Sequence, residues 1–171
     1  MGSGRHNLVF MGVSGCGKST VAALHAGATG ATLIEADDFH PPANVEKMRS
    51  GTPLTDADRA GWLSAMAGRI AEGRARGEAM VITCSALKRA YRDRLRAADP
   101  DLIFIHLTGS RELLAARIGA RKGHFMPPGL LDSQLDALEP PVAPDERCLT
   151  LDVASSPEAL GAAVATFLRD A

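Results

Sequence analysis

The sequence predicts an α/β fold in which a five-stranded parallel sheet lies between two layers of helices. Five short apolar runs recur along the chain, and each is separated from the next by a segment long enough for a helix. The runs are apolar at most positions instead of alternating with polar residues, which is typical of parallel strands covered by helices on both faces. The expected strands are 8–10, 31–35, 79–84, 102–107 and 148–153.

The segments between these runs carry helix signals. Apolar residues recur every three or four positions across 56–76, and Thr55 followed by Asp58 resembles an N-terminal cap. Ser156 and Pro157 form a second start signal, with proline at the first helical position, ahead of a closing helix. Helices that alternate with short strands predict a three-layer α/β/α arrangement.

Length, composition and charge limit the classes of function. The chain has 171 residues, 46% of them hydrophobic, and we expect one domain spanning 1–171. A formal net charge of -1 gives no overall attraction to nucleic acid. No apolar run approaches the roughly 18 residues of a membrane span and the polar start lacks a signal peptide, so no membrane partner is expected. Three widely spaced cysteines favour reduced thiols in a cytoplasmic protein over a zinc site or disulfides.

Residues 12–20 read GVSGCGKST and match the pattern G-x-x-x-x-G-K-S, with an apolar run before it and a helical pattern after it. Glycines let successive backbone N–H groups point into one cavity, and the following helix adds its positive end, so the loop suits a phosphate chain. Lys18 is expected to reach the β- and γ-phosphates, and Ser19 to offer its hydroxyl to Mg²⁺. The expected cofactor-binding residues here are Gly12, Val13, Ser14, Gly15, Cys16, Gly17, Lys18, Ser19 and Thr20, with no chemistry assigned to the Cys16 thiol.

The residues after the second expected strand indicate the reaction class. ADDFHP places Asp37, Asp38 and His40 at the carboxyl end of a parallel strand, the edge on which the phosphate loop also lies. Asp37 is a candidate to take a proton from an attacking hydroxyl or to hold the metal, whereas Asp38 is equally suited to cap the next helix. The chain lacks the Asn-Lys-x-Asp element of guanine-specific switches, and VITCSALK ends the third strand without the acid of motor ATPases. These features favour a small-molecule kinase.

Five ordered blocks carry a family resemblance: MGVSGCGKST, ADDFHP, NVEKMRSGTPLTDADRAGWL, CSALKRAYRDRLR and ARKGHFMPPGLLDSQLDALEPP. Together they resemble the gluconokinases of the thermoresistant type, within the P-loop kinase superfamily. The resemblance implies a P-loop kinase fold like that of nucleoside-monophosphate kinases, with a helical lid. It also implies transfer of the ATP γ-phosphoryl group to the 6-hydroxyl of D-gluconate, with Mg²⁺, in a cytoplasmic homodimer.

Gluconate has a carboxylate and a row of hydroxyls, so its pocket needs a cation at one end and hydrogen-bonding side chains along its length. Lys88 and Arg92 are four residues apart on an expected helix after the third strand, and hence on one face. The candidate cations are Lys47, Arg59, Lys88 and Arg92, and no choice among them follows from the sequence. The remaining candidates for substrate binding are Asp37, His40, Ser85 and Gln134.

Residues 117–140 are expected to form a lid over the nucleotide. Arg117 and Arg121 are four apart on an expected helix, and an arginine from such a segment can stabilise the transferring phosphoryl group or stack on adenine. Which arginine has which role stays open. Glycines and prolines around Phe125 are expected hinge points, so closure would exclude water. The expected catalytic residues are Asp37, Lys18 and Arg121.

Two other hypotheses remain open at this point. One keeps the chemistry but changes the acceptor to shikimate or another polyol acid. The other is a regulatory protein that binds ATP without turnover, because a phosphate loop alone does not specify catalysis.

Overall fold

The computed structural model describes residues 6–120 and 128–171, and its centre is a five-stranded sheet in the order β2-β3-β1-β4-β5. All four pairings are parallel, as predicted. The strands are β1 (Leu8–Met11), β2 (Thr32–Glu35), β3 (Met80–Thr83), β4 (Ile103–Thr108) and β5 (Cys148–Asp152). The helices are α1 (Lys18–Thr29), the 3-10 helix η1 (Ala36–Phe39), α2 (Pro42–Arg49), α3 (Asp56–Ala75), α4 (Arg89–Ala98), α5 (Arg111–Ala120), α6 (Pro128–Ala137) and α7 (Pro157–Asp170).

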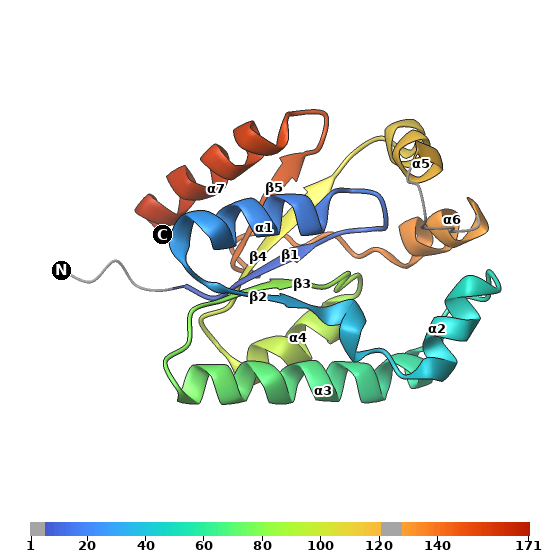
Figure 1. Ribbon diagram of the computed structural model, residues 1–171, viewed down its shortest axis with the longest axis horizontal. Coiled ribbons are helices and arrows are strands. Elements are labelled where there is room, and N and C mark those ends of the chain that lie inside the picture. Colours follow the sequence, from blue (N-terminus) through green and yellow to red (C-terminus); the bar gives the residue numbers. More distant parts are fainter. Residues whose placement is uncertain (1–5, 121–127) are drawn as a thin grey trace.

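Helices cover both faces of the sheet, α1 and α7 on one side and α3 and α4 on the other (Figure 1). Strand β1 shows why its run reads as continuously apolar. Leu8 and Phe10 belong to the core cluster under α1 and α7, whereas Val9 and Met11 belong to the cluster under α3 and α4. All four side chains are fully buried, because successive residues of a strand face opposite layers. The predicted three-layer α/β/α fold is confirmed.

The two edge strands differ from the expectation of full coverage. Strands β2 and β5 form the edges of the sheet, where β2 pairs with β3 and β5 pairs with β4. Leu33 on β2 is 38% exposed, and Asp152 on β5 is exposed. Apolar composition therefore predicted the strands correctly but did not distinguish central strands from edge strands.

Two helix starts follow the predicted chemistry. The Thr55 hydroxyl accepts a hydrogen bond from the Asp58 N–H, and the Asp58 carboxylate accepts one from the Thr55 N–H, which completes a capping box. The Ser156 hydroxyl caps α7 by accepting from the Ala159 N–H. The long helix ends at Ala75, one residue earlier than predicted. No helix within residues 6–120 and 128–171 is both long and apolar enough to cross a membrane.

The topology determines where a ligand can bind. The chain leaves β1 toward β2 at one edge of the sheet, whereas it leaves the adjacent strand β4 toward β5 at the other edge, so the direction of the connections reverses between β1 and β4. Crevices at the carboxyl ends of strands form at such a switch point. The loop between β1 and α1 lies there, and α2, α5 and α6 project at the same end of the molecule (Figure 1).

Candidate active site

The phosphate loop needs glycine at two positions for steric reasons. Gly12 has φ of 144°, and a Cβ atom there would lie 2.5 Å from the Leu107 carbonyl oxygen. Gly15 has φ of 82°, and a Cβ atom there would lie 2.7 Å from Cγ1 of Ile118. Side chains at these positions would be strained and would push the loop away from β4 and α5. Glycine at these two positions therefore lets the loop backbone pack directly against β4 and α5 just before α1 begins.

Lys18 and Gln134 make direct contacts with this loop. The Lys18 Nζ donates to the carbonyl oxygens of Gly12 at 3.0 Å and Val13 at 3.1 Å, so the ammonium group lies over the loop. The Ser14 N–H donates to Oε1 of Gln134, from α6, at 2.7 Å. Helix α6 is therefore hydrogen-bonded to the loop expected to hold phosphates.

Glu35, the last residue of β2, is a site residue that the sequence analysis missed. Its Oε2 accepts a hydrogen bond from the Ser19 hydroxyl at 3.1 Å and another from the Thr83 hydroxyl. Motor ATPases have an acidic residue at the end of the third strand, but here β3 ends at Thr83. The carboxylate at this position comes instead from Glu35, at the end of the neighbouring strand β2. The signal was a glutamate that ends an apolar run two residues before Asp37.

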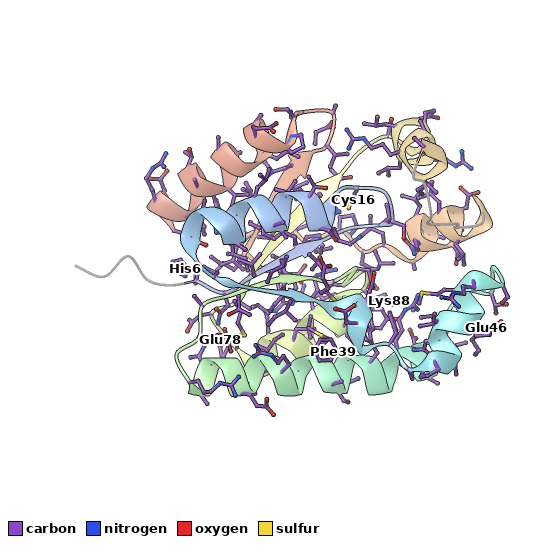
Figure 2. The ribbon with its side chains drawn as sticks, viewed as in Figure 1. His6, Cys16, Phe39, Glu46, Glu78 and Lys88 are labelled. Atoms are coloured by element: carbon purple, nitrogen blue, oxygen red, sulfur yellow. The ribbon has the colours of Figure 1, made fainter. Side chains whose placement is uncertain are left out.

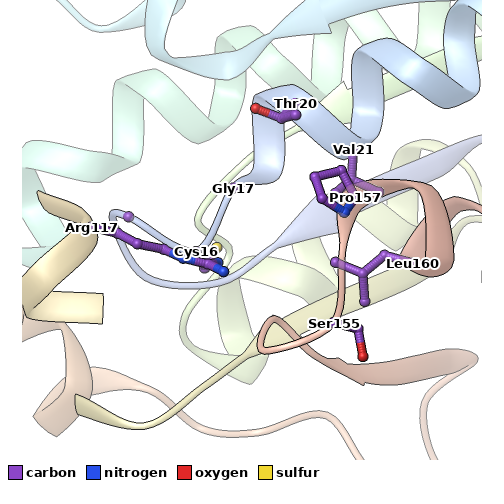
Figure 3. A pocket seen from close by; sticks show the side chains of 9 residues that line it. Cys16, Gly17, Thr20, Val21, Arg117, Ser155, Pro157 and Leu160 are labelled. Atoms are coloured by element: carbon purple, nitrogen blue, oxygen red, sulfur yellow. The ribbon is translucent and has the colours of Figure 1, made fainter. Parts of the chain in front are cut away.

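One cavity, of about 300 Å³, opens between the phosphate loop, α5 and the start of α7 (Figure 3). Arg117 lines it and donates through Nη2 to the Val153 carbonyl oxygen at 2.6 Å. Ser155, Pro157 and Leu160 also line it, although no single residue of this segment was predicted to bind the nucleotide. Arg121 lies outside the described residues, and so do the expected hinge points Gly123 and Pro127, whereas the other two, Pro128 and Gly129, begin α6. The lining residues are Gly15, Cys16, Gly17, Thr20, Val21, Arg117, Ser155, Pro157 and Leu160.

A second cavity, here called the acceptor cavity, lies on the other side of the loop and has a volume of about 90 Å³. It brings together five of the eight residues predicted to bind substrate, from η1, α3, the segment after β3 and α6. The predicted residues are Asp37, His40, Arg59, Ser85 and Gln134, together with Lys18 and Ser14 of the loop. The other lining residues are Met48, Pro53, Leu54, Trp62, Leu87, Leu130 and Ser133.

His40 is packed firmly in the wall of the acceptor cavity. Its side chain is 5% exposed, and its ring stacks on Trp62 with centroids 4.2 Å apart. The indole N–H of Trp62 donates to the Ala36 carbonyl oxygen at 2.7 Å, which holds the stack against η1. Burial lowers the pKa of His40, with Asp37 opposing and Arg59 adding to the effect, so the neutral ring is favoured at pH 7.

Two of the four candidate cations are paired with acids outside the acceptor cavity. The Lys47 Nζ lies 2.9 Å from both carboxylate oxygens of Asp58, and this contact helps to lower the pKa of Asp58 to about 2. The Lys88 Nζ donates to Oδ1 of Asp56 at 3.0 Å. Lys88 lies at the same end of the molecule as α2 (Figure 2), but it is the N-cap residue of α4 rather than part of its face. The expectation that it shares a helix face with Arg92 is therefore wrong.

Arg92 is a structural residue, which corrects its prediction as a substrate ligand. It is 1% exposed, and its guanidinium makes five hydrogen bonds, matching its five N–H donors. The acceptors are both carboxylate oxygens of Glu146 and the carbonyl oxygens of Ala86, Leu87 and Glu139. No donor remains for a substrate carboxylate.

Arg59 is the candidate cation that lines the acceptor cavity. Its Nη1 donates to the Leu54 carbonyl oxygen at 2.8 Å and to the Tyr91 hydroxyl at 3.2 Å, which directs the guanidinium along the cavity wall.

Asp38 is exposed and lines neither cavity. The alternative that Asp38 caps α2 is wrong, because Pro41 occupies the N-cap position and no side chain caps that helix.

Known proteins resemble this chain over most of its length. A family model described as an AAA domain matches residues 8–141. The chain is 53% identical to a gluconokinase of Gluconobacter oxydans over 78% of this chain and 75% of that one. It is 42% identical to the thermoresistant gluconokinase of Escherichia coli over 86% of this chain and 85% of the other.

Solved structures show the same relationship. The structure of a gluconokinase from Sinorhizobium meliloti superposes with a TM-score of 0.88 at 44% identity, covering 97% of this chain and 93% of that one. An adenosine-5'-phosphosulfate (APS) kinase of Mycobacterium tuberculosis shares the fold alone, with a TM-score of 0.69 at 20% identity over 98% of this chain and 99% of that one. The fold, the glycine-requiring phosphate loop and the identity to these relatives together show that the chain belongs to the gluconokinase family of P-loop kinases.

Proposed function

We propose that this protein is a gluconokinase that transfers the γ-phosphoryl group of ATP to the 6-hydroxyl of D-gluconate, forming 6-phospho-D-gluconate and ADP. Membership of the family supports the substrate. The observation that supports the proposal is the lining of the acceptor cavity, to which Asp37, Lys18 and Arg59 all belong. A sugar acid needs such a set: a base for the hydroxyl, charge for the phosphoryl group, and a cation for the carboxylate.

Asp37 is the proposed general base, with holding of the metal as the alternative. Its side chain is 86% exposed and lines the cavity, so a substrate hydroxyl can approach it directly. Proton acceptance by Asp37 would make the hydroxyl oxygen a better nucleophile, and Lys18 would stabilise negative charge on the transferring group. Arg121 stays a prediction for the same task.

Mg²⁺ is the proposed metal, and the residues at the start of α1 fit it. A hydroxyl and a carboxylate, Ser19 and Glu35, already contact one another at 3.1 Å, and oxygen is the ligand atom that Mg²⁺ prefers. Within the described part of the chain, no three His, Cys, Asp or Glu side chains cluster as metal ligands. One or two protein oxygens with substrate phosphates are the usual arrangement for Mg²⁺ in kinases. Bound there, the metal would neutralise charge on the phosphates.

The nucleotide is proposed to occupy the cavity between the phosphate loop and α7, with Arg117 beside the base. The position of Arg117 at that cavity, held to the Val153 carbonyl, supports stacking on adenine rather than contact with the transferring phosphoryl group. The family resemblance also supports a cytoplasmic homodimer and a lid, formed by residues 117–140, that closes over the nucleotide. Sedimentation of the purified chain tests the dimer.

A coupled assay for ADP tests the function, with D-gluconate, shikimate and a nucleoside monophosphate as acceptors. We expect turnover on gluconate and a phosphorus NMR signal of a 6-phosphate ester. Turnover on shikimate alone would show that the acceptor is another polyol acid. ATP binding without phosphorylated product from any acceptor would favour the regulatory alternative.

A further inference from the structure

Asn44 joins three elements beneath the acceptor cavity. It lies on α2, is 3% exposed, and its Nδ2 contacts both the Asp58 carbonyl oxygen of α3 at 2.9 Å and Nδ1 of His40 at 3.3 Å. A backbone carbonyl can only accept a hydrogen bond, so the Asp58 contact establishes which end of the Asn44 amide is nitrogen. The second amide hydrogen is then left for His40.

This contact determines the protonation of the His40 ring. An amide nitrogen only donates, so Nδ1 of His40 must accept and therefore carries no proton. A ring with a bare Nδ1 is neutral and has its proton on Nε2. Nε2 lies on the Asp37 side of the ring, 3.9 Å from Oδ1 of Asp37, and both residues line the acceptor cavity.

We propose that Asn44 is a positioning residue that holds the neutral His40 ring with its proton on Nε2, so that His40 donates a hydrogen bond to an oxygen of the acceptor substrate. The inference rests on the proposed function for the identity of that substrate, a polyhydroxy acid. A hydroxyl between the two groups can accept from His40 and donate to Asp37, since a gap of 3.9 Å is too long for a direct hydrogen bond. His40 would thus be excluded as a competing base, and Asp37 alone would receive the proton.

The stack with Trp62 makes the assignment rigid. The His40 and Trp62 rings are 16° from parallel, so the imidazole cannot rotate out of plane without breaking the stack. The Asn44 backbone N–H donates to the carbonyl oxygen of Pro41, the N-cap residue of α2, at 2.9 Å, and Pro41 directly follows His40, so the start of the helix fixes Asn44 close to His40. Ring orientation and ring protonation therefore come from different neighbours, Trp62 and Asn44.

Nitrogen NMR of histidine-labelled protein tests the protonation directly. Five histidines are present, and the His40 signals are assigned by their loss in His40→Gln. We expect wild-type His40 to show an unprotonated Nδ1 and a protonated Nε2. Asn44→Asp replaces the donor by an acceptor, and we expect the proton to appear on Nδ1. A wild-type ring with its proton on Nδ1 alone would overturn the proposal.

Asn7→Asp is the matched control, because Asn7 is the other asparagine of the chain and is also buried, 8% exposed, at Asp99. It should lower thermal stability, since it places two carboxylates together, and leave the His40 signals and the KM for gluconate unchanged. If Asn44→Asp does not fold, the wild-type spectrum still tests the protonation of His40, and the kinetics of the His40 variants still test its hydrogen bond to the substrate.

Kinetics test the donation to substrate. His40→Phe keeps an aromatic ring over Trp62 but removes the donor, and we expect the KM for gluconate to rise about tenfold with the KM for ATP within about twofold. His40→Gln retains an amide donor near the position of Nε2 and should recover part of the loss. An unchanged gluconate KM in His40→Phe would refute the donation even with the expected protonation. Failure of the wild type to phosphorylate gluconate would refute the proposed function instead, and the NMR result would stand by itself.

Discussion

At the scale of single residues, neighbouring side chains of the same type differ in what they can do. Asp37 and Asp38 are adjacent in the sequence, yet Asp37 lines the acceptor cavity and Asp38 does not. The 3-10 geometry of η1 turns successive side chains by about a third of a turn, so Asp37 lines the cavity and Asp38, the next residue, does not. The sequence favours Asp37 over Asp38 as the candidate base, and the short helix η1 is the reason that Asp37 and not Asp38 lines the cavity.

Asp37→Ala should separate binding from chemistry. We expect kcat to fall by about 10³-fold, because proton acceptance from the hydroxyl is lost, while the Kd for ATP changes by less than about threefold. Rapid-quench measurement of product and calorimetry with ATP check the two quantities. Asp38→Ala is the control and should keep wild-type kcat. Near wild-type turnover in Asp37→Ala would remove Asp37 as the base.

Arg59→Leu should distinguish among the four cations predicted to bind the substrate carboxylate. We expect the KM for gluconate to rise by about 10- to 100-fold, because a charged hydrogen bond to the carboxylate is lost, with little change in the KM for ATP. Arg49→Leu, on the exposed side of α2, is the matched control and should change the gluconate KM by less than about threefold. If Lys88→Leu raises the gluconate KM and Arg59→Leu does not, the assignment to Arg59 is wrong.

At the scale of elements, the phosphate loop and α6 depend on contacts with distant parts of the chain. Gly12 approaches β4, and Ser14 donates to Gln134, which is 120 residues away. Arg92 of α4 likewise binds Glu139, just after α6, and Glu146 before β5. The loop and the wall of the acceptor cavity are thus parts of one packed unit.

Gly12→Ala and Gly27→Ala test whether glycine has a steric function in the loop and none in α1. We expect Gly12→Ala to destabilise the fold by about 1–3 kcal/mol and to weaken ATP binding, because the new Cβ meets the Leu107 carbonyl. Gly27 lies in an exposed part of α1, and a Cβ atom there would meet no atom within 4 Å, so Gly27→Ala should stabilise by up to about 1 kcal/mol. Thermal unfolding and ATP calorimetry of both variants give the comparison. Equal effects of the two substitutions would contradict the steric account.

At the scale of the whole molecule, one buried histidine links stability to pH. His106 on β4 is 3% exposed, and neither of its ring nitrogens has a hydrogen-bond partner among the described residues. Burial, with the nearby charge of Arg92, lowers the pKa of His106 to about 4. The unfolded chain takes up this proton near pH 6.5 and the folded chain does not, so stability is lost as the pH falls from 6.5 to 4.

His106→Leu should remove this dependence. Between pH 7 and pH 5 we expect His106 to lower the unfolding free energy of the wild-type protein by about 2 kcal/mol. The variant lacks this contribution, so its unfolding free energy should fall by about 2 kcal/mol less than that of the wild type. Urea unfolding at the two pH values measures both. The carboxylates whose pKa values lie near 2, Asp58 and Glu78, contribute only at lower pH. The same pH dependence in both proteins would show that His106 is not the cause.

The fold and the phosphate loop could be predicted from sequence because their signals are local. Strand β1 is apolar on both faces, helix α3 has its capping box, and the loop has its glycines within eight positions. Glu35 and Asn44 were missed for the opposite reason. Their partners Thr83, Asp58 and Ser19 lie far along the chain or across a turn, and spacing within a motif does not report such contacts.

The sequence by itself determined that five apolar runs make a parallel α/β sheet, that a phosphate-binding loop lies between the first strand and the first helix, and that Asp37 lies near it. Only the tertiary structure decided which of the four candidate cations lines the acceptor cavity. Arg59 and Arg92 are the same residue type, yet Arg92 meets Glu146, 54 positions away, and Arg59 lines the cavity. Whether a segment forms a strand or a helix follows from the pattern of residues along the chain. Which residue a charged side chain pairs with depends instead on the distant segments that pack next to it in the folded protein.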